Sequence, residues 1–498
     1  MAEKHADMRG RPAISHVSLI ARNSIFVFMA RIIEVAFSLV SISLIARYLN
    51  VKLYGQYAYL TSIIAVAIPL AYFGLQRILI RDIARDRKKA GKYLGAAIIG
   101  RTVFSAVLIL GIYLFTVFMG FDKVSAEAIM LFAASEVILS YVALYISIYT
   151  AIEKMGIDTA LTIISCTFNL TVLATVIYLD LGFVNLFTAM LLSSVFTLVI
   201  AVLMTRRGIG RPDYTFDSAL LKYFFIESYP LVIVAFLTSA LFRVDVFVLK
   251  YYRGVEEISL FFAPHSVITK LQVVPLALTT AIFPSLSRTS GPSSDSFHAI
   301  YEKAFKFLFV VSLPVSILAH AYAREFIVIF FGPNFAGAAS ALRLMIWTVN
   351  IMFLECLFGF ILLAIHEQRF TAFNSAAILM VNFVLDMLLV PSYGYMGASV
   401  GTLIAYILRS LSSYTYVSIK TRPVSIFNIV LRPLMGGALM YLLIIRLKGF
   451  SNIAGIAAAV MAYAGTLFAT RHFTAGELAT FGDFFMKRHN KDLNKQTL

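Results

Sequence analysis

Two apolar runs joined by a short polar hairpin open the chain and constrain its fold more than any other feature. The first run, roughly residues 25–46, and the second, roughly 57–75, each have about the 20 residues that a helix needs to cross a bilayer. Residues 47–55 form the hairpin between them, and a dense basic stretch, 77–92, follows. This unit predicts one membrane crossing, a turn, a return crossing and then a positively charged segment on one side of the membrane.

The remainder of the chain elaborates this unit. Hydropathy predicts about fourteen apolar segments in all, near residues 23–46, 56–76, 94–119, 125–152, 159–179, 183–205, 223–249, 258–284, 304–321, 344–365, 371–390, 395–419, 424–445 and 452–470. The chain is 60% hydrophobic and only 14% charged, a balance that excludes a soluble globular domain. We therefore expect an all-α polytopic membrane protein.

The basic residues predict how the chain is oriented. The formal net charge is +16, but lysine and arginine gather in short loops between apolar runs, which argues against nucleic acid as a partner. With a cytoplasmic N-terminus, the even-numbered loops and both tails would hold about 27 of the 42 Lys and Arg residues, against about nine in the opposite loops. The positive-inside rule thus predicts a protein of the cell membrane with both termini in the cytoplasm.

A faint internal repeat predicts two halves. When Val51 is placed on Val255, the two polar hairpins overlay, and six spans separate them. An even separation means that both halves insert with the same orientation. The expected division is a cytoplasmic tail (1–22), a first half (23–205), a cytoplasmic linker (206–222), a second half (223–420), two additional spans (421–471) and a cytoplasmic tail (472–498).

Three stretches carry a family resemblance. They are Ala46-Arg47-Tyr48-Leu49-Asn50 with Leu53-Tyr54-Gly55-Gln56-Tyr57, Phe73-Gly74-Leu75-Gln76-Arg77 with Arg81-Asp82-Ile83-Ala84-Arg85, and Phe330-Phe331-Gly332-Pro333-Asn334-Phe335-Ala336-Gly337-Ala338 with Leu342-Arg343. Together they resemble the polysaccharide and lipid-linked oligosaccharide exporters of the multidrug/oligosaccharidyl-lipid/polysaccharide exporter superfamily. One departure is Asn50, where that family usually has glycine. Asparagine also tolerates a left-handed backbone, so we expect the turn to be kept.

The resemblance implies a fold and an activity. It implies two six-helix lobes that face each other across a central cavity, with the last two spans outside this core. It also implies that a polyprenyl-linked sugar is moved across the membrane by alternating access. The implied partners are the lipid-linked oligosaccharide, membrane lipids and other membrane proteins of polysaccharide assembly.

Charged side chains inside the apolar runs are the candidate site residues. A charge at the bilayer centre costs about 3 kcal/mol, so each must face protein or water. We expect the following roles: Arg31, Arg243, Lys270 and Arg409 as cavity cations that bind the phosphate groups; Glu34, Asp245, Asp386 and Glu136 as ion-coupling or pairing acids; and Asn169, His265, Gln272 and Asn382 as polar cavity lining.

Several pairings remain open at this point. Arg31 and Glu34 are three apart on one helical face, so they either serve the cavity or only neutralise each other. Asp386 and Arg409 either line one cavity wall or pair with each other. We expect Arg101 to extend its side chain to the cytoplasmic surface.

The motifs that the sequence lacks separate the function classes. It contains no P-loop motif, no His-Glu-x-x-His and no cysteine–histidine cluster, so we expect no catalytic residue, no metal site and no cofactor beyond a coupling proton or Na⁺. A flippase for lipid-linked oligosaccharide is the first hypothesis. A cation-coupled multidrug exporter is the second, and it needs an acidic cavity. A membrane glycosyltransferase or polymerase is the third, but loops 285–303 and 323–343 are short for such an enzyme.

Overall fold

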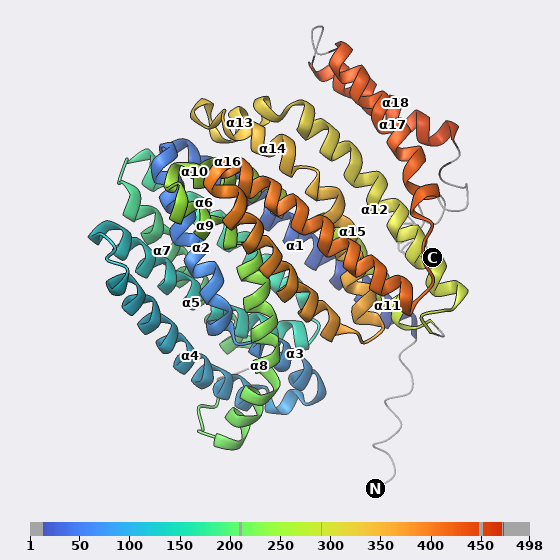
Figure 1. Cartoon of the computed structure of the whole chain (residues 1–498). Coiled ribbons are helices and arrows are strands. Elements are labelled where there is room, and N and C mark those ends of the chain that lie inside the picture. Colours follow the sequence, from blue (N-terminus) through green and yellow to red (C-terminus); the bar gives the residue numbers. More distant parts are fainter. Residues whose placement is uncertain (1–12, 209–211, 290, 448–451, 471, 473–498) are drawn as a thin grey trace, which may run out of the picture.

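The computed structural model describes residues 13–208, 212–289, 291–447, 452–470 and 472, and over these ranges the chain is helical without a strand (Figure 1). The elements in order are α1 (Ala13–Tyr48), α2 (Val51–Tyr72), α3 (Leu75–Arg85), η1 (Arg87–Lys89), α4 (Ala90–Phe118), α5 (Lys123–Ala151), α6 (Met155–Tyr178), α7 (Phe183–Gly208), α8 (Ser218–Leu241), α9 (Val244–Tyr252), α10 (Val255–Lys270), α11 (Val273–Ser287), α12 (Asp295–Ala321), α13 (Ala323–Phe331), η2 (Pro333–Phe335), α14 (Ala338–Met345), α15 (Thr348–Ala364), α16 (Gln368–Lys420), α17 (Ile426–Leu447) and α18 (Asn452–Ala469).

The expected membrane architecture is confirmed. Within the described ranges, 11 helices are long and apolar enough to cross a membrane, or 12 if the bent pair α14–α15 is one span. The long α16 also contains non-helical geometry at Gly394, so it consists of two arms, residues 368–393 and 395–420. Since α18 is a shorter apolar helix, the structure is roughly consistent with the fourteen spans expected.

The helices form two halves and an appendage. In the first half (α1–α7), α5 packs on α7 and α1 on α6; in the second half (α8–α16), α16 packs on α9 and α15. The pair α17–α18 lies outside this body and packs against α12, at the upper right of Figure 1. This is the arrangement that the family resemblance implied.

Two segments that were expected to be loops fold into short helices. Phe73 and Gly74 both have positive φ (44° and 63°), which separates α2 from α3. The basic stretch 77–92, expected as a loop, is therefore largely the helix α3. The expected loop 323–343 likewise folds into α13, η2 and most of α14. Hydropathy missed these helices because each, at 3 to 11 residues, is much shorter than a membrane span.

The turn at Asn50 is present, as expected, but its backbone conformation is not the left-handed one. Its φ of −72° is not left-handed; instead it is the N-cap of α2, and its side chain accepts a hydrogen bond from the backbone N–H of Leu53 at 2.8 Å. An asparagine N-cap satisfies one of the donors left free at the start of a helix. Asn50 therefore serves as a helix cap and does not supply a left-handed backbone conformation.

The two hairpins play equivalent parts in the two halves. Tyr48, at the first hairpin, donates its hydroxyl to Asp180 at 2.7 Å and accepts from the Gly182 N–H at 2.9 Å, in the α6–α7 turn. Glu257, at the second hairpin, accepts from the Tyr395 N–H at 2.6 Å, in the break of α16. Each hairpin thus holds the turn between the last two spans of its own half, which gives the sequence repeat a structural counterpart.

The halves are sealed together at the hairpin end, which we define as the end that carries the α1–α2 and α9–α10 turns. Gly55 packs so closely on α10 that a Cβ would overlap the Val255 carbonyl oxygen. Ser259 donates its hydroxyl to the Val51 carbonyl across the same contact. Tyr54 is fully buried there, with its ring against three phenylalanines, Phe262, Phe331 and Phe335.

Polar contacts join the halves at the opposite end, where α3 meets α8. The Arg81 guanidinium lies 3.0 Å from Glu227, and the Tyr223 hydroxyl donates to Asp82 at 3.0 Å. Lys92 on α4 pairs with Asp217 at 2.8 Å, just before α8 begins. This lysine, together with the Leu220 N–H, holds the pKa of the Asp217 carboxyl below its ordinary value.

Candidate functional site

A cavity of about 1020 Å³ lies between the two halves. Its wall comes from α1, α2, α3, α5, α6 and α7 of the first half and from α10 and the α8–α9 break of the second. It extends from Ile45 and Tyr57, beneath the hairpin seal, to Ile80 and Thr150 toward the opposite end. The Arg31 side chain, which lines this cavity, is 59% exposed.

The charges on the cavity wall are separated between the halves. In the described chain, the wall carries three basic residues (Arg31, Arg243, Lys270), three acidic residues (Glu34, Glu136, Asp158) and His265. All three acids come from the first half, whereas two of the three cations come from the second. The cavity is therefore balanced in formal charge, with a cationic wall facing an acidic one.

Arg31 and Glu34 line this cavity as an ion pair. The Arg31 Nη1 and Glu34 Oε2 atoms are 2.6 Å apart, because residues three apart on a helix share one face. Both side chains are about half exposed on the cavity side of α1. The two readings left open by the sequence therefore hold together: the pair neutralises itself and also faces the cavity.

Arg243 is placed by a break in the helix. Since α8 ends at Leu241 and α9 begins at Val244, Arg243 occupies the N-cap position between them and points into the cavity. Its guanidinium lies 5.1 Å from the centre of the Phe262 ring. Its Nη1 atom is buried without a hydrogen-bond partner in the described part of the chain. A buried hydrogen-bond donor without a partner is energetically costly, so this guanidinium is suited to bind an anion.

Lys270 lies on the same wall as Arg243. It is the last residue of α10 and lines the cavity together with Thr269 and Ser266. Among the residues that the structure covers, no carboxylate lies within ion-pair distance of its ammonium group. The second half thus presents two basic side chains to the cavity that no acid neutralises by direct contact.

A second, much smaller cavity of about 10 Å³ lies inside the second half. Asp245 lines it, and its Oδ1 accepts from Asn382 Nδ2 at 3.2 Å and from the Thr402 hydroxyl at 2.8 Å. Asp386, one turn beyond Asn382, is fully buried, and neither of its carboxylate oxygens has a donor in the described chain. Arg243 and Asp245 thus face different cavities. Two buried carboxylates with amide and hydroxyl oxygens suit a hard cation.

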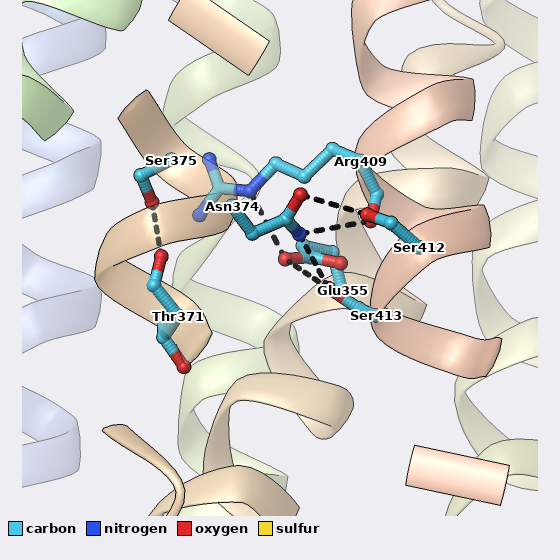
Figure 2. Close-up of polar contacts among 7 residues, drawn as sticks. All are labelled: Glu355, Thr371, Asn374, Ser375, Arg409, Ser412 and Ser413. Atoms are coloured by element: carbon cyan, nitrogen blue, oxygen red, sulfur yellow. Dashed lines mark hydrogen bonds and ion pairs between the residues drawn. The ribbon is translucent and has the colours of Figure 1, made fainter. Parts of the chain in front are cut away.

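The structure corrects the prediction that Arg409 is a cation of the large cavity. Arg409 does not line the large cavity and does not pair with Asp386; its Nε atom contacts Glu355 Oε1 at 3.0 Å, as Figure 2 shows. The partner lies on α15, a helix that the sequence did not connect with Arg409. The pair is largely buried, with 14% and 13% of the side chains exposed. Arg409 lines the small cavity instead.

Gln272 is a second correction. It lies at the break between α10 and α11, is exposed, and is absent from the lining of either cavity. His265, Thr269 and Gln272 could share one face only if the helix continued past Lys270. The break after Lys270 ends that face, so only His265 and Thr269 remain on the wall.

Four further predicted residues, Glu136, Asn169, Asn382 and His265, lie on cavity walls. Glu136 and Asn169 line the large cavity from α5 and α6, and Asn382 lines the small one. His265 lines both cavities and stacks on Phe261, with ring centres 5.4 Å apart. It therefore forms part of the partition between the two cavities.

Two functional positions were not predicted correctly. Asp158 on the cavity wall was missed, although it precedes Thr162, Ser165 and Asn169 at three- and four-residue steps and extends their polar stripe along α6. Arg101 was expected at the membrane surface but is fully buried. Its Nη1 donates to the Ser140 carbonyl at 3.2 Å, and its guanidinium lies 5.3 Å from the Tyr72 ring centre.

Comparison with known proteins gives one family match. The model of the family described as polysaccharide biosynthesis protein matches residues 20–290. A Shigella flexneri protein named "Putative O-antigen transporter" is 22% identical over 417 residues, which cover 79% of this chain and 96% of that one. A Haloferax volcanii protein named "Probable low-salt glycan biosynthesis flippase Agl15" is 20% identical over 476 residues, covering 91% and 95% of the two chains.

A solved structure shares the fold. The lipid II flippase MurJ, in an inward closed conformation, superposes with a TM-score of 0.73 at 15% identity, covering 91% of this chain and 99% of that one. At this identity the likeness concerns the fold. It agrees with the arrangement of two halves around a central cavity.

Proposed function

Because the chain belongs to the family of polysaccharide biosynthesis proteins, we propose that it is a flippase for lipid-linked oligosaccharide or polysaccharide precursors in the cell membrane. The observation that carries this proposal is the pair Arg243 and Lys270, two basic side chains that no acid of the described ranges contacts, on the wall of a cavity of about 1020 Å³. The O-antigen transporter and glycan flippase names of its relatives support the same substrate class.

The cavity suits the three parts of such a substrate. The phosphate groups would bind the Arg243 guanidinium and the Lys270 ammonium, because hydrogen bonds between ionised partners are the strong ones. The sugar would occupy the polar lining on α5, α6 and α7, where serine, threonine and asparagine side chains face the cavity. The prenyl chain would remain in lipid, outside the cavity that Arg31 and Glu34 line.

The seal at the hairpin end fits one state of an alternating-access cycle. With both termini in the cytoplasm, the hairpin end lies at the far membrane face, and the cavity is closed to that face by the contact of α2 with α10. Release on the far side then requires this contact to open while the α3–α8 contacts change. The substrate and the coupling ion can drive the exchange only through different affinities for the two states.

The small cavity supplies a candidate for the coupling step. Asp245 and Asp386, with Asn382 and Thr402, would hold a proton or Na⁺, and the cation would relieve the repulsion between the two buried acids. His265, which lies between the two cavities, would transmit to the large cavity whether the coupling cation is bound in the small one. This chain's part is to position the oxygens and to exclude water.

A multidrug exporter on the same fold remains a second candidate, favoured by the acids Glu34, Glu136 and Asp158 on the opposite wall. The two candidates differ in which wall binds the substrate. Glu136→Gln would impair export of a cationic drug but leave oligosaccharide flipping largely unchanged. Arg243→Gln would do the reverse.

Disruption of the gene tests the proposal. We expect a lipid-linked oligosaccharide to accumulate on the cytoplasmic face, and its sugar analysis identifies the substrate. Complementation by the wild-type gene, but not by a double Arg243→Gln, Lys270→Gln variant of equal abundance, would support the assigned wall. An unchanged pool of lipid-linked sugars together with increased sensitivity to cationic drugs would favour the exporter instead.

A further inference from the structure

We propose that Arg409 is an internal cation that competes with the coupling cation for Asp245, exchanging between Glu355 and the Asp245–Asp386 acids. This inference deepens the proposed function and rests on the coupling site assigned there. It gives the Asp245–Asp386 acids a counter-charge when the coupling cation has left.

The charges of this interior motivate the proposal. In the described part of the second half, Asp245 and Asp386 are buried, Asp245 lines the small cavity, and the largely buried Glu355 contacts Arg409. Arg409 is the basic residue that lines this small cavity, whereas Arg243 faces the large one. A buried charge without a counter-charge is strongly unfavourable, so one guanidinium shared among three acids has two competing positions.

The geometry leaves Arg409 free to exchange. Only its Nε atom contacts Glu355 among the described residues, and the other Glu355 oxygen, Oε2, has no partner. In Figure 2 the terminal guanidinium nitrogens point away from Glu355, toward the first arm of α16 near Ser375. Arg409 and Asp245 line the same cavity, which has room for about one water molecule. Arg409 therefore shares a cavity wall with Asp245, and its two terminal nitrogens make no hydrogen bond to Glu355 among the described residues.

The surrounding network holds the backbone and leaves the side chain to move. Asn374 on the first arm donates to the Arg409 carbonyl at 3.3 Å and to the Ser413 hydroxyl at 3.1 Å, and Ser412 donates back to Asn374 at 2.8 Å (Figure 2). The two arms of α16 are thus bonded to each other on either side of the guanidinium. Exchange of Arg409 therefore needs a rotamer change rather than a movement of the arms.

Arg409 also lies on the correct side of its helix to reach the acids. Thr402, which donates to Asp245, precedes Arg409 by seven residues on the same arm, about two turns or 10 Å along the axis. Side chains of a helix lean toward its N-terminus, so the long arginine leans toward Thr402 and Asp245. The bound cation and the guanidinium would then be alternative partners of one carboxylate.

Na⁺-dependent thermal stabilisation of the purified full-length protein tests the exchange, because it reads cation binding without transport. Removing the competitor by Arg409→Gln should raise the apparent Na⁺ affinity at least about fivefold. Removing its other partner by Glu355→Gln should leave Arg409 on Asp245 and lower the affinity by a similar factor. The double variant Arg409→Gln, Glu355→Gln, which removes the guanidinium together with the carboxylate that it contacts, should behave like Arg409→Gln.

Two controls complete the experiment. Arg369→Gln removes an exposed arginine from the same helix and should leave the affinity unchanged. Asp245→Asn should abolish the stabilisation.

Opposite shifts for Arg409→Gln and Glu355→Gln are the signature of competition. Equal or same-direction shifts would mean that the pair only braces the helices, and would overturn the inference. If Asp245→Asn abolishes the stabilisation while neither of these variants alters it, the coupling site stands and the exchange fails. If Na⁺ does not stabilise the wild-type protein, both the Na⁺ site and the exchange fail, and the flippase assignment is then decided by the lipid-linked sugar pool.

Discussion

A methyl group added at Gly55 should shift the protein away from the conformation in which the hairpin end is sealed. The new Cβ of Gly55→Ala would overlap the carbonyl group of Val255. This neighbour is helix backbone, which cannot turn aside as a side chain can. Overpacking of this kind costs about 1–3 kcal/mol. The cost arises only while α2 and α10 touch, so the open population should rise about 5- to 150-fold.

Thiol labelling from each side of the membrane measures this shift. Cys166 lines the large cavity, so in a Cys356→Ser background it is a native reporter of access. An impermeant maleimide added at the hairpin side should label Cys166 faster in Gly55→Ala by a comparable factor. Gly111→Ala is the matched control, because a Cβ there meets nothing within 4 Å. Equal labelling rates in the two variants would refute the close contact of Gly55 with α10, or the exchange between a sealed and an open conformation.

Three further predictions concern the site, the opposite end and the first turn. Arg243→Gln and Lys270→Gln should each weaken substrate binding about 10- to 100-fold, since a hydrogen bond to a charged group contributes about 1.5–3 kcal/mol; binding of a labelled polyprenyl diphosphate measures this, and an unchanged affinity would contradict the site. The lowered pKa of Asp217 means that its pairing with Lys92 is fully present above the ordinary carboxyl pKa, about pH 4, and is lost as the pH falls further. The Asp213 amide, bonded to the Gly91 carbonyl, should then lose protection from hydrogen exchange, and equal protection at pH 7 and pH 3 would count against the pairing. Asn50→Ala should cost about 1 kcal/mol of stability and Asn50→Gly only a few tenths in thermal unfolding, whereas equal losses would deny the cap.

The architecture could be predicted because it depends on local properties. Apolar runs of bilayer length, the polar hairpins and their repeat each lie in one stretch of sequence. The positions of Arg31, Glu34 and Lys270 on the cavity wall follow from the cost of a charge in lipid, which requires contact with protein or water. The same cost of a charge in lipid places Glu136 on the wall, and the cost of burying an unpaired amide in lipid does so for Asn169.

The errors came from contacts between distant spans and from helix breaks. Arg409 pairs with Glu355 on another helix, and no periodicity within its own span reveals that partner. The break after Lys270 removes Gln272 from the wall, and hydropathy does not show such a break. Arg101 is buried because Ser140 and Tyr72 receive its guanidinium inside the first half, a position that its distance from the end of the span does not indicate.

The most direct measurement is flipping of a lipid-linked oligosaccharide by the purified protein in proteoliposomes. Oligosaccharide linked to polyprenyl diphosphate is placed in the inner leaflet, and an impermeant glycosidase outside reports its arrival in the outer leaflet. We predict transfer by the wild-type protein and its loss when Arg243 and Lys270 are both replaced by glutamine. Transfer that is absent from the wild-type protein, or that is unaffected by the double replacement, would contradict the account.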